Sequence, residues 1–164
     1  MDSDQSRVKY VPFEEHSISD NQLKWILTHV IGKVDHDERE GIRSADLSGY
    51  DKLNLRVDVE EIVTGISMRR IYVELGSKVK SVPSVSFMEF YDRHLSGNLP
   101  VSDSVTAAAC LNLDGRGVVN AYSNGVVSPR VLNRGDIFMW DPRKASVSLD
   151  RIDLGTKVMV YGLI

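Results

Sequence analysis

The four histidines are the side chains best suited to metal binding or proton transfer, and their positions restrict both kinds of chemistry. They are His16, His29, His36 and His94, and none occurs in the seventy residues that follow His94. Imidazole is the commonest metal ligand in proteins and titrates near neutral pH. A metal site within the C-terminal part of the chain would therefore need ligands from elsewhere in the sequence, or carboxylates alone.

Carboxylates gather in the segment DHDEREGIRSAD, which starts at Asp35 and ends at Asp46. Asp35, Asp37 and Asp46 take positions 1, 3 and 12 of an EF-hand loop, in which oxygen ligands surround calcium. However, Arg39 stands where a third oxygen ligand belongs, and Glu40 replaces the glycine of the sharp turn. We expect a solvated acidic loop, with Asp35, Asp37 and Asp46 as the candidate ligands if a metal binds.

Other catalytic patterns are missing from the sequence. The chain has neither a G-x-S-x-G nucleophile turn nor a P-loop for phosphate binding. Its single cysteine, Cys110, lies in the apolar run AAACLNL, which is typical of a small buried residue rather than a nucleophile. We predict no catalytic residue and no cofactor.

Aromatic residues beside turns are the candidates for contact with a partner protein. Trp140 ends an apolar run just before charged residues, and a large aromatic side chain in such a place often anchors an interface. Near the N-terminus, the segment YVPF supplies an apolar anchor. We expect the interaction residues to be Trp140, Asp141, Arg143, Tyr10 and Phe13.

The N-terminal part is predicted to hold an arm, a helix and a loop. Residues 1–17 show no sustained period and are interpreted as an extended arm. Residues 19–33 carry apolar side chains at helical spacing after Ser19 and Asp20, either of which can cap an amphipathic helix. Residues 35–50 have the polar, glycine-bearing composition of a loop.

Strand character begins at residue 52. Residues 53–60 and 70–75 alternate apolar and polar side chains, which predicts an antiparallel pair of strands. Residues 84–97 fit either a helical face or a strand, and we predict a short helix because Gly97 could end it. Residues 18–164 are expected to form a single β-rich domain.

Beyond Pro100, short apolar runs alternate with turn signals. Candidate strands lie at residues 104–113, 117–123, 126–132, 136–140, 144–152 and 156–163. Asp-Gly and Asn-Gly pairs between them favour tight hairpins. The tripeptide Arg134-Gly135-Asp136 falls at one of these corners, and we interpret it as a turn rather than an adhesion motif.

The closing segments NRGDIFMWDPRKASVSLDRI and GTKVMVYGLI resemble the last strands of cupin-type double-stranded β-helix domains, in which a Gly-Asp turn leads into an apolar strand. When such domains are enzymes, they hold a metal through an H-x-D or H-x-E pair and a later histidine. His36 and Glu38 form a nominal H-x-E pair, but it precedes the first predicted strand and has only His94 downstream. The resemblance therefore implies a form without the metal.

These patterns together predict an α+β, β-dominant fold. We expect an N-terminal amphipathic helix packed on an antiparallel β-sandwich or a jelly-roll, cupin-like barrel. A chain of 164 residues suits one domain, and 42% apolar residues can build its core. The net charge of −3 and the lack of clustered basic residues disfavour binding to nucleic acid, and no apolar run is long enough for a membrane helix.

The first hypothesis for function is a non-catalytic protein–protein interaction or assembly protein, such as a viral or phage component that binds itself or another protein. It rests on the absence of a complete catalytic or metal constellation. The alternative is a cupin-like small-molecule-binding protein or enzyme with a pocket in the C-terminal barrel. Because the N-terminus lacks the features of a signal peptide, we expect a cytoplasmic or virion-associated protein.

Overall fold

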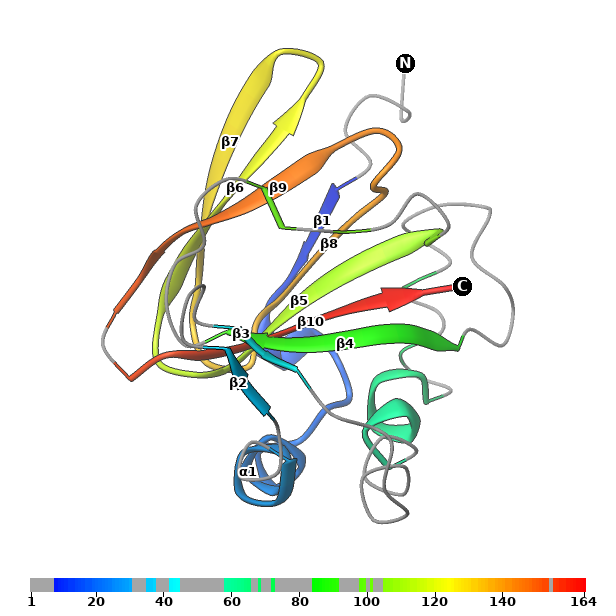
Figure 1. Cartoon of the computed structure of the whole chain (residues 1–164), viewed down its shortest axis with the longest axis vertical. Coiled ribbons are helices and arrows are strands. Elements are labelled where there is room, and N and C mark those ends of the chain that lie inside the picture. Colours follow the sequence, from blue (N-terminus) through cyan, green and yellow to red (C-terminus); the bar gives the residue numbers. More distant parts are fainter. Residues whose placement is uncertain are drawn as a thin grey trace.

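A computed structural model shows a β-sandwich with helices on one side (Figure 1). It describes residues 8–30, 35–37, 42–44, 58–65, 68, 72, 84–91, 98–99, 101, 105–153 and 155–164. The larger sheet has the strand order β1 (Val8–Val11), β8 (Ile137–Trp140), β5 (Ala107–Asp114), β10 (Lys157–Leu163), β4 (Val85–Tyr91), β3 (Ile42–Ser44) and β2 (Asp35–Asp37). The smaller sheet has the order β7 (Val126–Leu132), β6 (Gly117–Ser123) and β9 (Ser146–Ile152).

The larger sheet is buried on both faces, because its side chains alternate between two apolar layers. In β10, Val158 and Val160 belong to the layer between the two sheets, whereas Met159 and Tyr161 belong to the layer between the larger sheet and the helices. The first of these, the inner layer, also contains Cys110, Phe138 and Trp140 from the larger sheet and Val119, Val147 and Leu149 from the smaller sheet. The second, the outer layer, joins the sheet to the helices.

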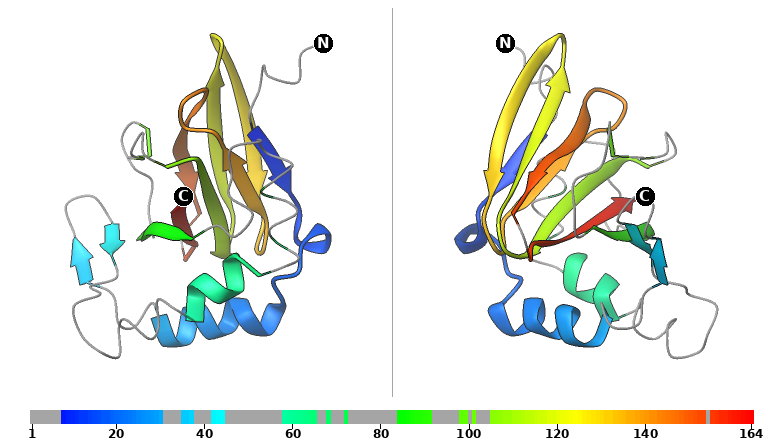
Figure 2. Two further views of the ribbon diagram at one scale, coloured as in Figure 1. Left: turned by 90° about the vertical axis from the view of Figure 1, so that its right-hand side faces the viewer. Right: turned by 60° about the vertical axis from the view of Figure 1, so that its left-hand side comes forward.

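The helix predicted near the N-terminus is confirmed over its described residues. It consists of α1 (Asp20–Trp25) and a π-helical continuation, η2 (Ile26–Val30). Ser19 and Gln22 form a capping box in which each side chain accepts from the other residue's backbone N–H. Leu23 and Ile26 are buried in the outer layer, and Figure 2 shows α1 beneath the sheet beside the helical residues 58–63.

Three predictions of secondary structure are wrong. Residues 58–60, expected at the end of a strand, belong instead to the helical residues 58–63, whose buried Val59 and Val63 are spaced four residues apart on the outer layer. Met68 and Tyr72, at or near the second predicted strand, are also helical. Conversely, the expected helix at residues 84–97 begins with a strand, β4, which pairs with β10 over its length.

The predicted loop at residues 35–50 contains a pair of short strands instead. β2 and β3 run antiparallel, with Asp35 opposite Ser44 and Asp37 opposite Ile42. β3 in turn pairs with β4 and extends the larger sheet. The remainder of the predicted loop lies outside the described residues.

The predicted strands beyond residue 104 are all confirmed, with bounds that differ by three residues or fewer. Asn124 and Gly125 both have positive φ, of 52° and 76°, as the tight hairpin between β6 and β7 requires. Gly135, at φ 90°, makes the corner before β8, so the Arg-Gly-Asp tripeptide is a turn as predicted. No described helix is long and apolar enough to cross a membrane.

The predicted extended arm is docked onto the sheet from Val8 onward. β1 pairs antiparallel with β8, with Tyr10 opposite Phe138. Pro12 then leads into η1 (Phe13–Glu15), a single 3-10 turn that lies against the Gly135 corner. The arm therefore supplies the edge strand of the larger sheet.

Candidate functional site

The inner face of the larger sheet carries one partly exposed carboxylate among buried apolar side chains. Glu89 of β4 stands opposite Val160 of β10, which stands opposite Cys110 of β5 and then Phe138 of β8. Val160, Cys110 and Phe138 all belong to the buried inner layer. Glu89 occupies the same row at its β4 end, yet solvent still reaches it.

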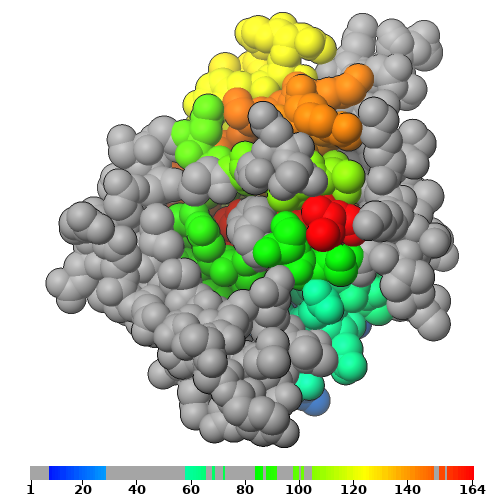
Figure 3. Space-filling view, turned by 45° about the vertical axis from the view of Figure 1, so that its right-hand side comes forward, coloured from blue at the N-terminus to red at the C-terminus, as the bar shows by residue number. Residues whose placement is uncertain are grey.

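A hydrogen bond with Tyr91 confirms that Glu89 lies on the inner face. Tyr91 is two residues further along β4, belongs to the inner layer and is buried. Its hydroxyl donates to Oε2 of Glu89 at 2.7 Å. Bonds between a neutral donor and a carboxylate are stronger than neutral pairs, so this bond holds the orientation of the carboxylate. In the space-filling view, β4 (green) and the end of β10 (red) lie beside each other at the surface (Figure 3).

The sequence analysis missed Glu89 because residues 84–97 were assigned to a helix. In a helix, Glu89 and Tyr91 would point to different sides. In a strand, residues two apart share a face. The alternation of Val85, Phe87 and Glu89, which suits a strand, was the available signal.

Cys110 lies in the inner layer, where it is the small buried residue that the sequence predicted. It is fully buried, and burial raises the pKa of its thiol to about 12. The thiolate is the nucleophilic and metal-binding form of cysteine. Cys110 therefore acts as a small apolar residue at neutral pH.

His16 is the one histidine whose ring contacts are described, and both of its nitrogens are used. Nδ1 accepts from the backbone N–H of Ile18 at 3.2 Å, so the ring proton must be on Nε2. Nε2 then donates to the carbonyl oxygen of Gly135 at 2.6 Å. Burial lowers the pKa of His16, against smaller opposite effects of Gly135, Asp136 and Glu14.

Asp136 anchors the N-terminal arm to the same corner, and it accounts for two of the predicted interaction residues. It is buried and accepts from the hydroxyl of Tyr10 at 2.9 Å and from the backbone N–H of Phe13 at 3.1 Å. It also accepts from the N–H of Asn133 at 2.8 Å, which closes the turn. The ring of Tyr10 lies 4.5 Å from the guanidinium of Arg130. Tyr10 and Phe13 thus contact the chain's own sheet.

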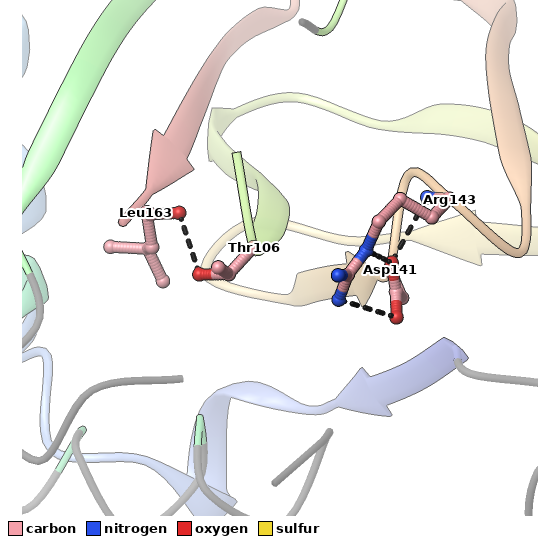
Figure 4. A network of polar contacts seen from close by, with 4 residues as sticks. All are labelled: Thr106, Asp141, Arg143 and Leu163. Atoms are coloured by element: carbon pink, nitrogen blue, oxygen red, sulfur yellow. Dashed lines mark hydrogen bonds and ion pairs between the residues drawn. The ribbon is translucent and has the colours of Figure 1, made fainter. Parts of the chain in front are cut away.

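The other predicted interaction residues form the turn after β8. Trp140 is only 1% exposed and packs in the inner layer, so it is not the surface contact that we expected. Asp141 is buried, accepts from the backbone N–H of Arg143 at 2.9 Å, and pairs with its Nε at 3.2 Å (Figure 4). The same figure shows the Thr106 hydroxyl donating to the carbonyl of Leu163 at 2.9 Å.

The metal candidates of the sequence analysis stay predictions. Asp35 and Asp37 lie on β2, but their side chains and the whole of Asp46 are outside the described part of the chain. The nominal pair of His36 and Glu38 is affected in the same way, as is His94. Within the described residues, no three His, Cys, Asp or Glu side chains come together as a metal site would require.

Comparison with solved structures identifies the architecture. The fold is similar to HygX from Streptomyces hygroscopicus, solved with nickel, 2-oxoglutarate and hygromycin B bound, with a TM-score of 0.64, 11% identity, and 98% of this chain and 83% of that chain covered. It is also similar to an oxidoreductase of the 2OG-Fe(II) oxygenase family from Burkholderia pseudomallei, with a TM-score of 0.61, 11% identity, and coverages of 87% and 77%. A Pseudomonas putida prolyl-4-hydroxylase matches with a TM-score of 0.52, 12% identity, and coverages of 96% and 91%. No protein-family model and no curated protein matches the sequence.

These matches correct the first hypothesis for function. The similar solved structures include oxygenases and a related epimerase, so the prediction of a non-catalytic assembly protein is wrong. They favour the alternative, a cupin-like protein with a site in the barrel. The described residues do not supply the two histidines and one carboxylate of a non-haem iron centre, however. The chain has the jelly-roll, cupin-like fold, and Glu89 lies on the described inner face of its larger sheet.

Proposed function

We propose that this protein binds a small molecule between its two sheets, where Glu89 and Tyr91 lie on the inner face of β4. The single observation that carries the proposal is the partly exposed carboxylate of Glu89 in an otherwise buried apolar layer. Ligand sites in proteins are largely apolar and contain a few polar groups that fix orientation. HygX, which has a similar fold, was solved with 2-oxoglutarate and hygromycin B bound, and this supports the binding of a small molecule.

The chemistry of the pair indicates which ligands it would favour. An ionised carboxylate only accepts hydrogen bonds, and each of its oxygens can accept more than one. The Tyr91 hydroxyl binds Oε2 and leaves Oε1 of Glu89 to accept from a ligand. The site therefore suits an ammonium or hydroxyl group attached to an apolar body, which would contact the inner layer.

A matched set of three fragments tests this preference. Benzylamine, benzyl alcohol and benzoate share one aromatic body and differ in the polar group that meets Glu89. We expect benzylamine to bind most tightly and benzoate most weakly, as measured by ligand-observed NMR titration. A hydrogen bond to a charged group contributes about 1.5–3 kcal/mol, so Glu89→Gln should weaken benzylamine binding by roughly tenfold or more.

The control removes the same charge from the surface. Glu15, in η1, is exposed, so Glu15→Gln changes the net charge equally without touching the inner face. It should leave the three affinities unchanged. Equal effects of the two substitutions would show that net charge, and not the Glu89 contact, sets the preference. Failure of all three fragments and of a larger fragment library to bind saturably would reject a small-molecule site in the barrel.

A further inference from the structure

We infer that this barrel binds its ligand without a transition metal, although the solved structures with a similar fold include proteins named as iron oxygenases. The ligand in this inference is the small molecule of the proposed function, whereas the absence of a bound metal can be measured independently of it. It follows from the side chains that could bind a metal, namely the histidines, the cysteine and the carboxylates. The requirement is strict, since a facial triad needs two imidazoles and one carboxylate converging on one point.

The strands that enclose the inner layer contain no imidazole at all. β5 to β10 span residues 107–163, and every histidine of the sequence precedes them. Two histidines would therefore have to reach the space between the sheets from the part of the chain that precedes β5. Four are available, and the structure positions three of them at least by their backbone.

His16 is excluded because both of its ring nitrogens are occupied by the backbone. The N–H of Ile18 donates to Nδ1, and Nε2 donates to Gly135. A metal ligand must present a free nitrogen lone pair. Binding through either nitrogen of His16 would break a bond that holds the N-terminal arm at the Gly135 corner.

Two further histidines are placed by their backbone alone. His29 lies in η2, and Ile26 of the same element is buried in the outer layer. His36 lies on β2, the strand at the opposite edge of the larger sheet from β1. Among the described residues no histidine ring belongs to the inner layer, whereas a facial triad needs two.

Thiolate and carboxylate donors do not replace the missing histidine among the described residues. Cys110 lies on the inner face, but its buried thiol keeps its proton at neutral pH. Asp136 is buried with three donors already bound to it. Glu89 is then the carboxylate of the described inner face that can accept from a ligand, and a single carboxylate holds a divalent transition metal weakly.

The test measures metal directly in the full-length protein after removal of any histidine tag. The chain is expressed in medium supplemented with iron and nickel, and its metal content is measured by elemental analysis. Nickel(II), with and without 2-oxoglutarate, is then titrated into the apo protein by calorimetry. We expect less than one tenth of an equivalent of metal after purification and no stoichiometric site with a dissociation constant below about 10 μM.

Two outcomes would overturn the inference, one in the metal titration and one in a measurement of benzylamine binding. A stoichiometric site tighter than that limit, lost in His94→Ala, would show that the chain completes a metal centre. Benzylamine binding is also measured with and without EDTA. Binding that persists unchanged in EDTA supports a metal-free site, whereas binding abolished by EDTA and restored by nickel(II) overturns it. If no fragment binds, the proposed function fails while the metal titration still decides this inference.

Discussion

Replacing Gly135 with alanine should destabilise the protein more than the same change at another turn glycine. Gly135 has φ 90°, a conformation that costs an L-residue about 1–2 kcal/mol. A Cβ at this position would also come within 2.8 Å of Cδ1 of Phe13, and closer still to two other carbons of that ring. The ring must move, and because Phe13 packs against the outer layer, part of that packing is lost.

The magnitude follows from adding the two effects. Displacing a partly buried aromatic ring removes a fraction of the 1.5–3 kcal/mol gained by burying such a side chain, or about 1–2 kcal/mol. Gly135→Ala should therefore lower the free energy of unfolding by about 2–4 kcal/mol. Gly125→Ala is the matched control, since Gly125 has φ 76° and nothing lies within 4 Å of the added Cβ. It should cost only about 1–2 kcal/mol.

Urea unfolding of both variants measures the difference, with equal m-values as the condition for comparing midpoints. The double variant Gly135→Ala, Phe13→Ala should be less destabilised than the sum of the two single changes, because removing the ring removes the clash. If Gly135→Ala and Gly125→Ala destabilise equally, within about 0.5 kcal/mol, Phe13 does not lie against this corner. The docking of the N-terminal arm would then be wrong.

Two further predictions concern the same corner. Asp136→Asn replaces a carboxylate by an amide with one acceptor oxygen, so at least one of its three donors loses its partner, and we expect a loss of roughly 1–3 kcal/mol in urea unfolding. The second is a dependence on pH. The folded pKa of His16 lies below its unfolded value of about 6.5, mainly through burial, so the unfolded state binds more protons between the two values. The stability from neutral His16 is thus present above pH 6.5 and lost as the pH falls through the folded pKa, and His16→Gln should flatten this part of the unfolding midpoint against pH.

The C-terminal strands could be predicted from sequence because their turns are encoded locally. Asn124-Gly125 and Gly135 require positive φ, which few other residues adopt at low cost, so these positions alone divide the chain into strands. The cap of α1 was visible for the same reason, since Ser19 and Gln22 bond to each other's backbone. Both features depend on residues within a few positions of one another.

The errors fall where distant pairing decides the structure. β4 is a strand because β10 and β3 provide hydrogen-bond partners on both sides, and those strands are far away in sequence. Residues 58–63 are helical because Val59 and Val63 can both reach the outer layer, a surface that exists only after the sheet forms. Local propensity is similar for both states in such short apolar segments, so tertiary contacts choose between them.

The histidine positions, in contrast, were informative without any structure. Because no histidine follows His94, a metal site within the C-terminal sheet would need ligands from elsewhere in the chain, and this stays a prediction. Treating missing motifs as evidence for an assembly protein was wrong. One fold can host many unrelated functions, so function has to be argued from the residues of the site. Glu89 could not be found from sequence because its role depends on the strand identity of β4.

The polar side chains of the barrel differ in whether they form hydrogen bonds with the backbone. Asn112 donates to the carbonyls of Gly115 and Leu132, both at 2.9 Å, and thereby holds the turn beside β5. Thr156 donates to the carbonyl of Arg116 and accepts from its N–H. Each of these side chains replaces a missing backbone partner, which is sufficient reason for its burial. Glu89 serves no backbone group in this way: its described bond is to the Tyr91 side chain, and the pair leaves an acceptor oxygen open on the inner face. Because solvent still reaches Glu89, this oxygen can accept a hydrogen bond from water or from the ligand proposed above.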